Sequence, residues 1–113
     1  MTNKDTLVVV PAYNEFQNLE SAVLDLNNYF KNILVVDDGS NDSSEELLEQ
    51  LDIRHIKHAI NLGQGAALHT GFTYFLSQKK FKYVITFDGD GQNRASDAKK
   101  MLNVLKKKNF LQY

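Results

Sequence analysis

The amino-acid sequence predicts an α/β protein in which a mostly parallel sheet of about four strands carries helices on both faces. Two short aliphatic runs, 7–10 and 33–36, contain no polar residue. Strands that are covered on both faces read as continuous apolar runs, whereas half-exposed strands alternate with polar residues. Stretches with apolar residues at helical spacing separate the runs. Such alternation of strands and helices is typical of parallel α/β sheets.

The first predicted strand covers residues 6–10 and ends at Pro11, because proline has no N–H to donate to a sheet. A helix should follow, with Asn14 as its N-cap and Gln17 at the second position of a capping box. Its buried face is predicted to hold Leu19, Ala22, Val23, Leu26 and Phe30.

A second strand is predicted at 33–36. Asp42 and Glu45 form another capping-box pattern, which predicts a short helix through Leu47, Leu48 and Leu51. Residues 53–58 mix charges with isoleucine, as an edge strand does.

The second half of the chain repeats the pattern. After a loop at 61–65, a helix is predicted with Leu68, Phe72, Phe75 and Leu76 on one side. The fourth strand is predicted at 83–87, and a last helix carries Ala98, Met101, Leu102 and Leu105.

Length and composition indicate one globular domain, residues 1–113, with 42% apolar residues and a net charge of −1. This charge predicts no sequence-independent attraction to nucleic acid. The absence of cysteine excludes disulfides and thiolate metal sites. No apolar run approaches the roughly 20 residues that span a bilayer, so we expect a cytoplasmic protein. The lysines in 99–108 are interpreted as a solvated helix face; the alternative is peripheral contact with the inner face of the membrane.

Acidic residues follow three of the predicted strands. Glu15 comes after the first, Asp37 and Asp38 after the second, and Asp88 and Asp90 after the fourth. Ligands of open parallel sheets bind beyond the carboxyl ends of the strands, so we expect these carboxylates to meet at one edge. Clustered carboxylates repel one another unless a cation is present, and hard oxygen ligands favour Mg²⁺ or Mn²⁺. A cation held there would in turn bind a diphosphate.

Each segment also has a purely structural interpretation. The stretches 37–40 and 88–91 fit ordinary turns, and the glycines of 61–65 fit a loop that enters a helix. That loop is no dinucleotide fingerprint, since Leu68 stands where the third glycine would fall, and no Gly-Lys-Ser/Thr phosphate loop occurs. The three histidines show no metal-ligand spacing and are interpreted as structural or surface residues: His55, His58 and His69.

Four segments in order nevertheless resemble glycosyltransferase family 2, most closely its dolichyl- or polyprenyl-phosphate sugar transferases and their bacterial relatives. They read VVVPAYNE, ILVVDDGSNDSS, NLGQGAALHTGF and YVITFDGDGQ. The resemblance implies a Rossmann-like GT-A fold, truncated to its nucleotide-sugar-binding N-terminal part. It implies a donor bound with Mg²⁺ or Mn²⁺, with a UDP-sugar favoured over a GDP-sugar. It also implies inverting transfer to a polyprenyl-phosphate or glycan acceptor.

The resemblance implies roles for the first two strand ends. Pro11, Ala12, Tyr13 and Glu15 would line the nucleotide pocket, with Glu15 near the ribose or base. Asp38 would accept a hydrogen bond from the base, and the neighbouring carboxylate would support the site: Asp37.

The third and fourth segments would hold the phosphates. Asn61, Gly63 and Gly65 match a loop whose missing side chains let its backbone approach the nucleotide. Asp88, Gly89 and Asp90 match the Asp-x-Asp motif. Asp90 would ligate the metal, and Asp88 would bind the metal through its water or contact the ribose. The metal would stabilise the leaving nucleoside diphosphate as a Lewis acid.

The sequence departs from the family pattern in one segment and leaves two alternatives open. Asn93, Arg94 and Ala95 stand where many relatives have His before Asp-Pro, and the family's general base lies beyond the matched region, so no catalytic residue is assigned. One alternative is a non-catalytic binding or assembly module of the same fold. The other is a response-regulator receiver domain, with Asp88 as phosphoacceptor. An uncovered sheet edge also predicts self-association.

Overall fold

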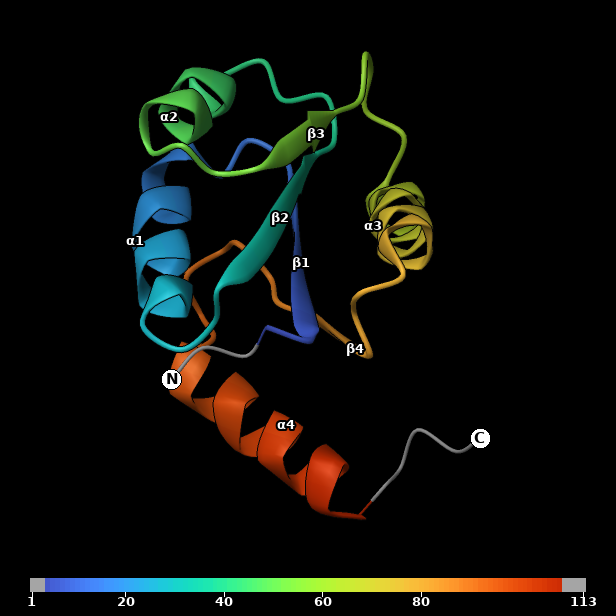
Figure 1. Ribbon diagram of the computed structural model, residues 1–113. Helices are drawn as coiled ribbons and strands as arrows, with labels where there is room; N and C mark the ends of the chain where they lie inside the picture. Colours follow the sequence, from blue (N-terminus) through green and yellow to red (C-terminus); the bar gives the residue numbers. More distant parts are fainter. Residues whose placement is uncertain (1–3, 109–113) are drawn as a thin grey trace.

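Four parallel strands in the order β3-β2-β1-β4 form the sheet of the computed structural model, which describes residues 4–108 (Figure 1). Strands and helices alternate along the chain as predicted. The elements are β1 (Thr6–Ala12), α1 (Phe16–Asn27), β2 (Asn32–Asp37), α2 (Ser44–Gln50), β3 (His55–Lys57), α3 (Gln64–Gln78), β4 (Tyr83–Thr86) and α4 (Ala95–Lys108).

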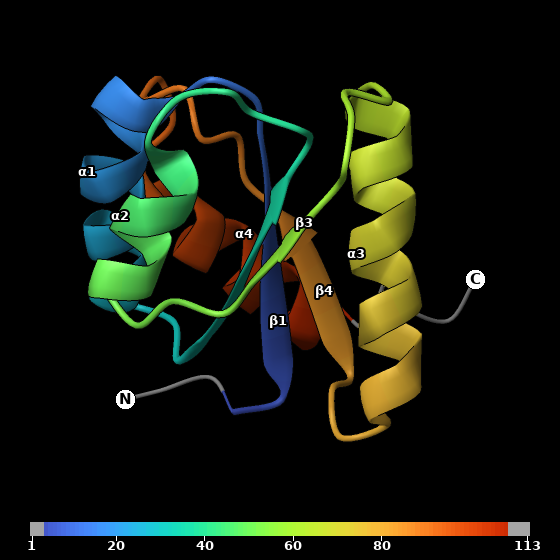
Figure 2. The ribbon, with the colours of Figure 1, turned by 90° about the horizontal axis from the view of Figure 1, so that it is seen from above.

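Helices cover both faces of the sheet, which explains the continuous apolar runs in β1 and β2. α1, α2 and α4 lie on one face and α3 lies on the other (Figure 2). Successive side chains of a strand point to opposite faces. Val8 and Val10 therefore pack with the three helices, whereas Leu7 and Val9 pack beneath α3. Both faces of β1 are excluded from water, because an apolar cluster covers each of them.

The strand order reverses beside β1. The chain moves outward from β1 through β2 to β3, and α3 then carries it back across the sheet to β4 on the other side of β1. The carboxyl ends of β1 and β4 diverge at such a point and leave a crevice, which is where open α/β sheets bind ligands.

β1 extends beyond its predicted end. Pro11 pairs in register with Val36, and Ala12 accepts a hydrogen bond from Asp38 N at 2.8 Å. Backbone groups alternate in direction along a strand, so the position of Pro11 faces β4 rather than β2. The ladder with β4 ends at Phe87 N, which donates to Val9 O. Pro11 has no N–H to continue this ladder, so the pairing with β4 stops there while the pairing with β2 continues to Ala12.

The predicted cap of α1 is wrong. Glu15, not Asn14, precedes the first helical residue, and Asn14 has a positive φ of 53°. Asp42, 26 residues further on, accepts a hydrogen bond from the first helical N–H, that of Phe16. Asp42 also accepts from Ser44 N at 3.0 Å, although the residue at the N-cap of α2 is Ser43. One carboxylate thus serves the starts of two helices.

The predicted buried face of α3 is only partly right. Phe75 packs against the apolar cluster of the sheet, but Phe72 and Leu76 are 40% and 71% exposed. The buried residues of the helix are small: Ala67 and Gly71. A Cβ at position 71 would lie 2.4 Å from Val9 Cγ1, so glycine permits the close approach. In α4, Ala98 and Leu102 are buried as predicted, but Met101 is 50% exposed.

None of the helices in residues 4–108 combines the length and apolar character that crossing a bilayer requires.

Candidate functional site

A cavity of about 380 Å³ opens at the carboxyl ends of the strands, where the sheet order reverses. The strand ends that carry the predicted acidic residues therefore converge, as the sequence indicated. The residues that line the cavity are Pro11, Ala12, Tyr13, Glu15, Asp38, Asn61, Gly63, Gln64, Ala67, Asp88, Gly89 and Asp90. Gln64 and Ala67 were not predicted, and both come from the first turn of α3.

Asp88 and Asp90 follow β4 and reach the cavity from one side. Asp90 Oδ1 accepts a hydrogen bond from Gln92 N at 3.0 Å, which is a local turn contact. Asp88 Oδ1 accepts from Gln64 Nε2 at 3.4 Å. The second oxygen of each carboxylate accepts no hydrogen bond from the described part of the chain. Both groups therefore retain oxygen atoms that can serve as ligands.

Residues that follow β3 donate hydrogen bonds to both carboxylate oxygens of Asp38. Its Oδ1 accepts from His58 and from Leu62 N, at 2.7 and 3.0 Å. Its Oδ2 accepts from Asn61 Nδ2 and Gly63 N, at 2.8 and 2.7 Å. A carboxylate offers about four lone-pair positions, and all four are used here. These hydrogen bonds to Asp38 fix the conformation of the loop that forms one wall of the cavity.

The hydrogen bonds to Asp38 also lower its pKa. Burial of the side chain by itself raises the pKa, because water no longer solvates the charge. The bond from His58 and those from the N–H groups of Leu62 and Gly63 outweigh burial, and the pKa falls below its ordinary value. Asp38 is therefore a charged, fully satisfied structural anchor at neutral pH.

His58 is a structural residue, as the sequence suggested, and it acts beside the cavity by holding Asp38. Its two ring nitrogens contact Asp38 Oδ1 at 2.7 Å and Thr70 Oγ1 at 2.8 Å. The ring links β3, the loop and α3, and only 10% of its side chain is exposed. No local pattern reveals this role, because Asp38 lies 20 residues away. The one feature of the sequence that points to this role is that His58 is a polar residue directly after an edge strand.

Asp37 does not line the cavity, and it supports the site indirectly through hydrogen bonding. The side chain is buried, and its Oδ1 accepts from Ser40 N at 3.0 Å. The hydroxyl of Ser40 in turn accepts from Asn14 N, which ties the end of β1 to the end of β2. Within residues 4–108, Asp37 Oδ2 is buried without a hydrogen-bond partner.

The loop between β3 and α3 depends on glycine at two positions. Gly63 has a φ of 104°, and its N–H donates to Asp38. Gly39, at φ 78°, lies so close to the loop that a Cβ there would meet the carbonyl carbon of Ile60 at 2.4 Å. Gly65 lies in the first turn of α3, outside the cavity lining, and its predicted contact with nucleotide stays a prediction.

The start of α3 leaves its N–H groups available at the cavity. No side chain caps this helix, whose first residue, Gln64, lines the cavity. The first N–H groups of a helix have no partner within the helix, and the helix dipole makes this end partly positive. The same cavity therefore contains two carboxylates and a helix start that favours an anion.

The chain matches the model of the family described as glycosyl transferase family 2 over residues 7–112. The chain belongs to glycosyltransferase family 2. A relative from Methanocaldococcus jannaschii, an uncharacterized protein, is 41% identical over 102 residues, which cover 88% of this chain and 42% of that protein. The UDP-N-acetylglucosamine–dolichyl-phosphate N-acetylglucosaminyltransferase of Methanococcus voltae is 31% identical over 122 residues, which cover 90% of this chain and 47% of the enzyme.

A solved structure supports the fold. The crystal structure of TarS 1–349 from S. aureus matches 90% of this chain and 32% of its own, with a TM-score of 0.62 and 19% identity. The GT-A-like α/β fold predicted from the sequence is therefore confirmed, and membership of family 2 rules out the receiver-domain alternative. The chain spans less than half the length of the relatives named above.

Proposed function

We propose that this family 2 chain binds the nucleotide-diphosphate sugar and a divalent cation for inverting sugar transfer. The observation that carries the proposal is one shared cavity of about 380 Å³, which is lined by Asp88, Asp90 and the uncapped start of α3. A diphosphate has charge and oxygen atoms suited to both features.

Asp88 and Asp90 fit a hard cation in number and kind of ligand. Mg²⁺ is commonly held by one or two carboxylates together with substrate phosphates. Two carboxylates with unused oxygens are present, and the described residues bring no third carboxylate or imidazole into a ligand cluster with them. When bound, Mg²⁺ or Mn²⁺ neutralises the charge that develops on the departing nucleoside diphosphate.

The nucleoside end is assigned to the side of the cavity formed by β1 and the loop after β3. Tyr13 is 45% exposed, and Glu15 offers a carboxylate for the ribose or base. Asp38 as acceptor for the base stays a prediction, since one of its four present donors would have to give way. Its firmer role is to hold the backbone of Leu62 and Gly63 in place as the cavity wall.

The proposed acceptor is a polyprenyl phosphate, because the dolichyl-phosphate transferase named above is a relative. UDP as the nucleotide, peripheral contact with the membrane and self-association are part of the same proposal. A binding module without turnover is the alternative, and the release of UDP from a UDP-sugar in the presence of acceptor separates the two.

Titration calorimetry with UDP, with and without Mn²⁺, tests the binding site. Asp90→Asn should weaken Mn²⁺-dependent UDP binding at least about tenfold, since it removes one charged metal ligand. Asp52→Asn is the matched control, because Asp52 lies outside the cavity. Equal UDP affinity with and without Mn²⁺, or equal losses in both variants, would show that Asp90 does not hold the cation.

A further inference from the structure

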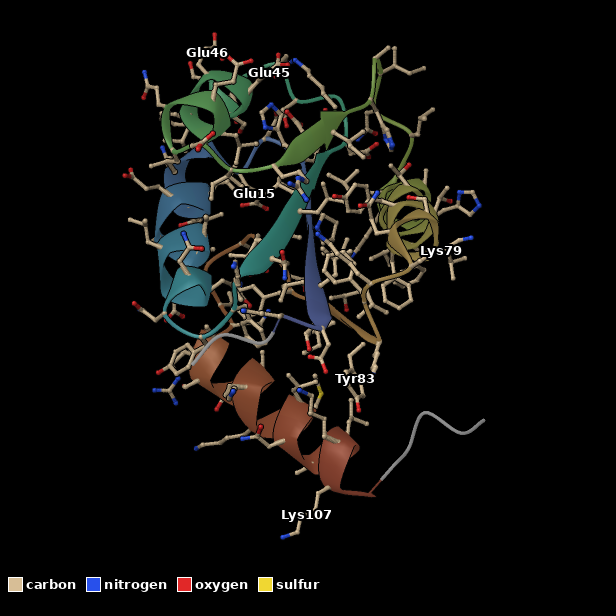
Figure 3. All side chains as sticks on the ribbon, in the orientation of Figure 1. Glu15, Glu45, Glu46, Lys79, Tyr83 and Lys107 are labelled. Carbon is tan, nitrogen blue, oxygen red and sulfur yellow. The ribbon has the colours of Figure 1, made fainter. Side chains whose placement is uncertain are left out.

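A second group of ligand-type side chains lies on the opposite face of the sheet from α3. Glu45 and Glu49 of α2 and His55 of β3 place one ligand atom each within 4.8 Å of one another. We call these three residues the α2–β3 cluster. Figure 3 shows Glu45 nearer β3 than its neighbour Glu46, which lies further out on α2. None of the three lines the nucleotide cavity.

The backbone positions this cluster. Glu45 and Glu49 are four residues apart, so they lie on one face of α2. His55 pairs in register with Val35, whose side chain belongs to the apolar cluster beneath α1 and α2. Since paired residues point to the same face of a sheet, His55 is directed toward α2.

The tautomer of His55 suits metal binding. Its Nδ1 lies 2.8 Å from the carbonyl oxygen of Ile53, an acceptor only, so Nδ1 must carry the proton. In a neutral ring the lone pair then resides on Nε2. Metal-binding histidines usually have this arrangement, in which a carbonyl fixes the ring and the other nitrogen ligates.

The fold stabilises the negative charges of this cluster only in part. Glu45 lies in the first turn of α2, where the helix dipole stabilises it, but Glu49 lies in the last turn, where the dipole opposes a negative charge. Like charges four residues apart also repel. Residues 42–53 contain five acidic residues and no lysine or arginine. A bound cation would relieve this repulsion.

We propose that the α2–β3 cluster is a zinc site. Carboxylates and imidazole are both ligand types that Zn²⁺ accepts, and water can complete a tetrahedron around three protein ligands. Tetrahedral ligand atoms around Zn²⁺ are separated by roughly 3.3 Å, so small side-chain rotations suffice. Lys57 Nζ now lies 3.4 Å from Glu45 Oε1 and competes for that carboxylate. Because both side chains of this pair are more than 30% exposed, the competition is weak.

Calorimetric titration of the chain with Zn²⁺ at pH 7.5 tests the proposal. The titrations use an Asp90→Asn background, so that the nucleotide cavity does not contribute. One saturable equivalent is expected, and His55→Gln or Glu49→Gln should weaken it at least about tenfold. His69→Gln and Glu46→Gln are the matched controls, since both residues are exposed and lie outside the cluster. Neither control should change the affinity.

Two further results distinguish ligation from general attraction to acidic residues. Lys57→Met should tighten Zn²⁺ binding, because it removes the competing ammonium. Zn²⁺ should also shift the Nε2 nitrogen signal of His55 in the NMR spectrum and leave His69 unchanged. Absence of a saturable equivalent would overturn the zinc site, and so would undiminished binding by His55→Gln. Neither result would bear on UDP binding at Asp90.

Discussion

At the scale of single residues, the site depends most on Asp38. Its carboxylate is buried and receives four hydrogen bonds, three of them from residues 61–63 and the fourth from His58. Such a group is costly to bury unless each lone pair is satisfied, and here each is. The network ties β2 to β3, to the loop and, through Thr70, to α3.

Asp38→Asn should lower the free energy of unfolding at pH 7 by about 3 kcal/mol, because an amide turns one acceptor into a donor that faces N–H groups. The folded-state pKa lies below the ordinary value of about 3.9. The stabilising effect of the charge is therefore complete above that value and disappears as the pH falls through the lower, folded-state pKa.

Urea unfolding followed by circular dichroism between pH 7 and pH 3 measures this difference. The gap between the wild type and Asp38→Asn should stay constant down to about pH 5 and shrink below pH 4. Asp97→Asn serves as control, since its side chain is 64% exposed and should change little at any pH. A gap that persists undiminished at pH 3 would contradict the role assigned to the charge.

At the scale of elements, sequence periodicity located all four strands and all four helices, because buried strands and amphipathic helices are determined by local patterns. The helix starts were harder to predict. Asn14 looked like a cap, yet Asp42 supplies the acceptor from another loop. The face of α3 was partly misjudged because the pattern of large apolar residues pointed to Phe72 and Leu76, whereas the helix packs through Gly71.

Gly71→Ala tests the packing of α3. The added methyl group would lie 2.4 Å from Val9 Cγ1 and should destabilise the protein by about 1–3 kcal/mol, even though alanine favours helix. Val9→Ala in the same chain should recover part of that loss, so the two effects should not add. Gly65→Ala, with open space around its Cβ, is the matched control. Thermal unfolding that shows equal stability for the two alanine variants would contradict the close contact.

At the scale of the whole molecule, the strand order creates the site. α3 returns the chain across the sheet to β4, which brings Asp88 and Asp90 into one cavity with the end of β1 and the loop held by Asp38. The sequence predicted this convergence, because acidic residues followed three strands. It did not reveal the roles of His58, Gln64 or Asp42. Each of these residues contacts groups that are far away in the sequence and become neighbours only when the chain folds.

The free edge of β4 is the other feature at this scale. Within residues 4–108, β4 pairs only with β1, and exposed apolar side chains occur on α3 and α4, among them Phe72, Leu76 and Met101. Unpaired strand edges and exposed apolar side chains both favour association. The chain spans less than half of the relatives it matches. Self-association through this region stays a prediction.

The most direct test of the account is the NMR spectrum of the chain titrated with UDP and Mg²⁺. If the strand ends form one nucleotide site, the backbone amide signals of Gly63, Gln64 and Gly89 should shift together, and only when both ligands are present. Shifts confined to the opposite end of the sheet, or none at millimolar UDP and Mg²⁺, would contradict it.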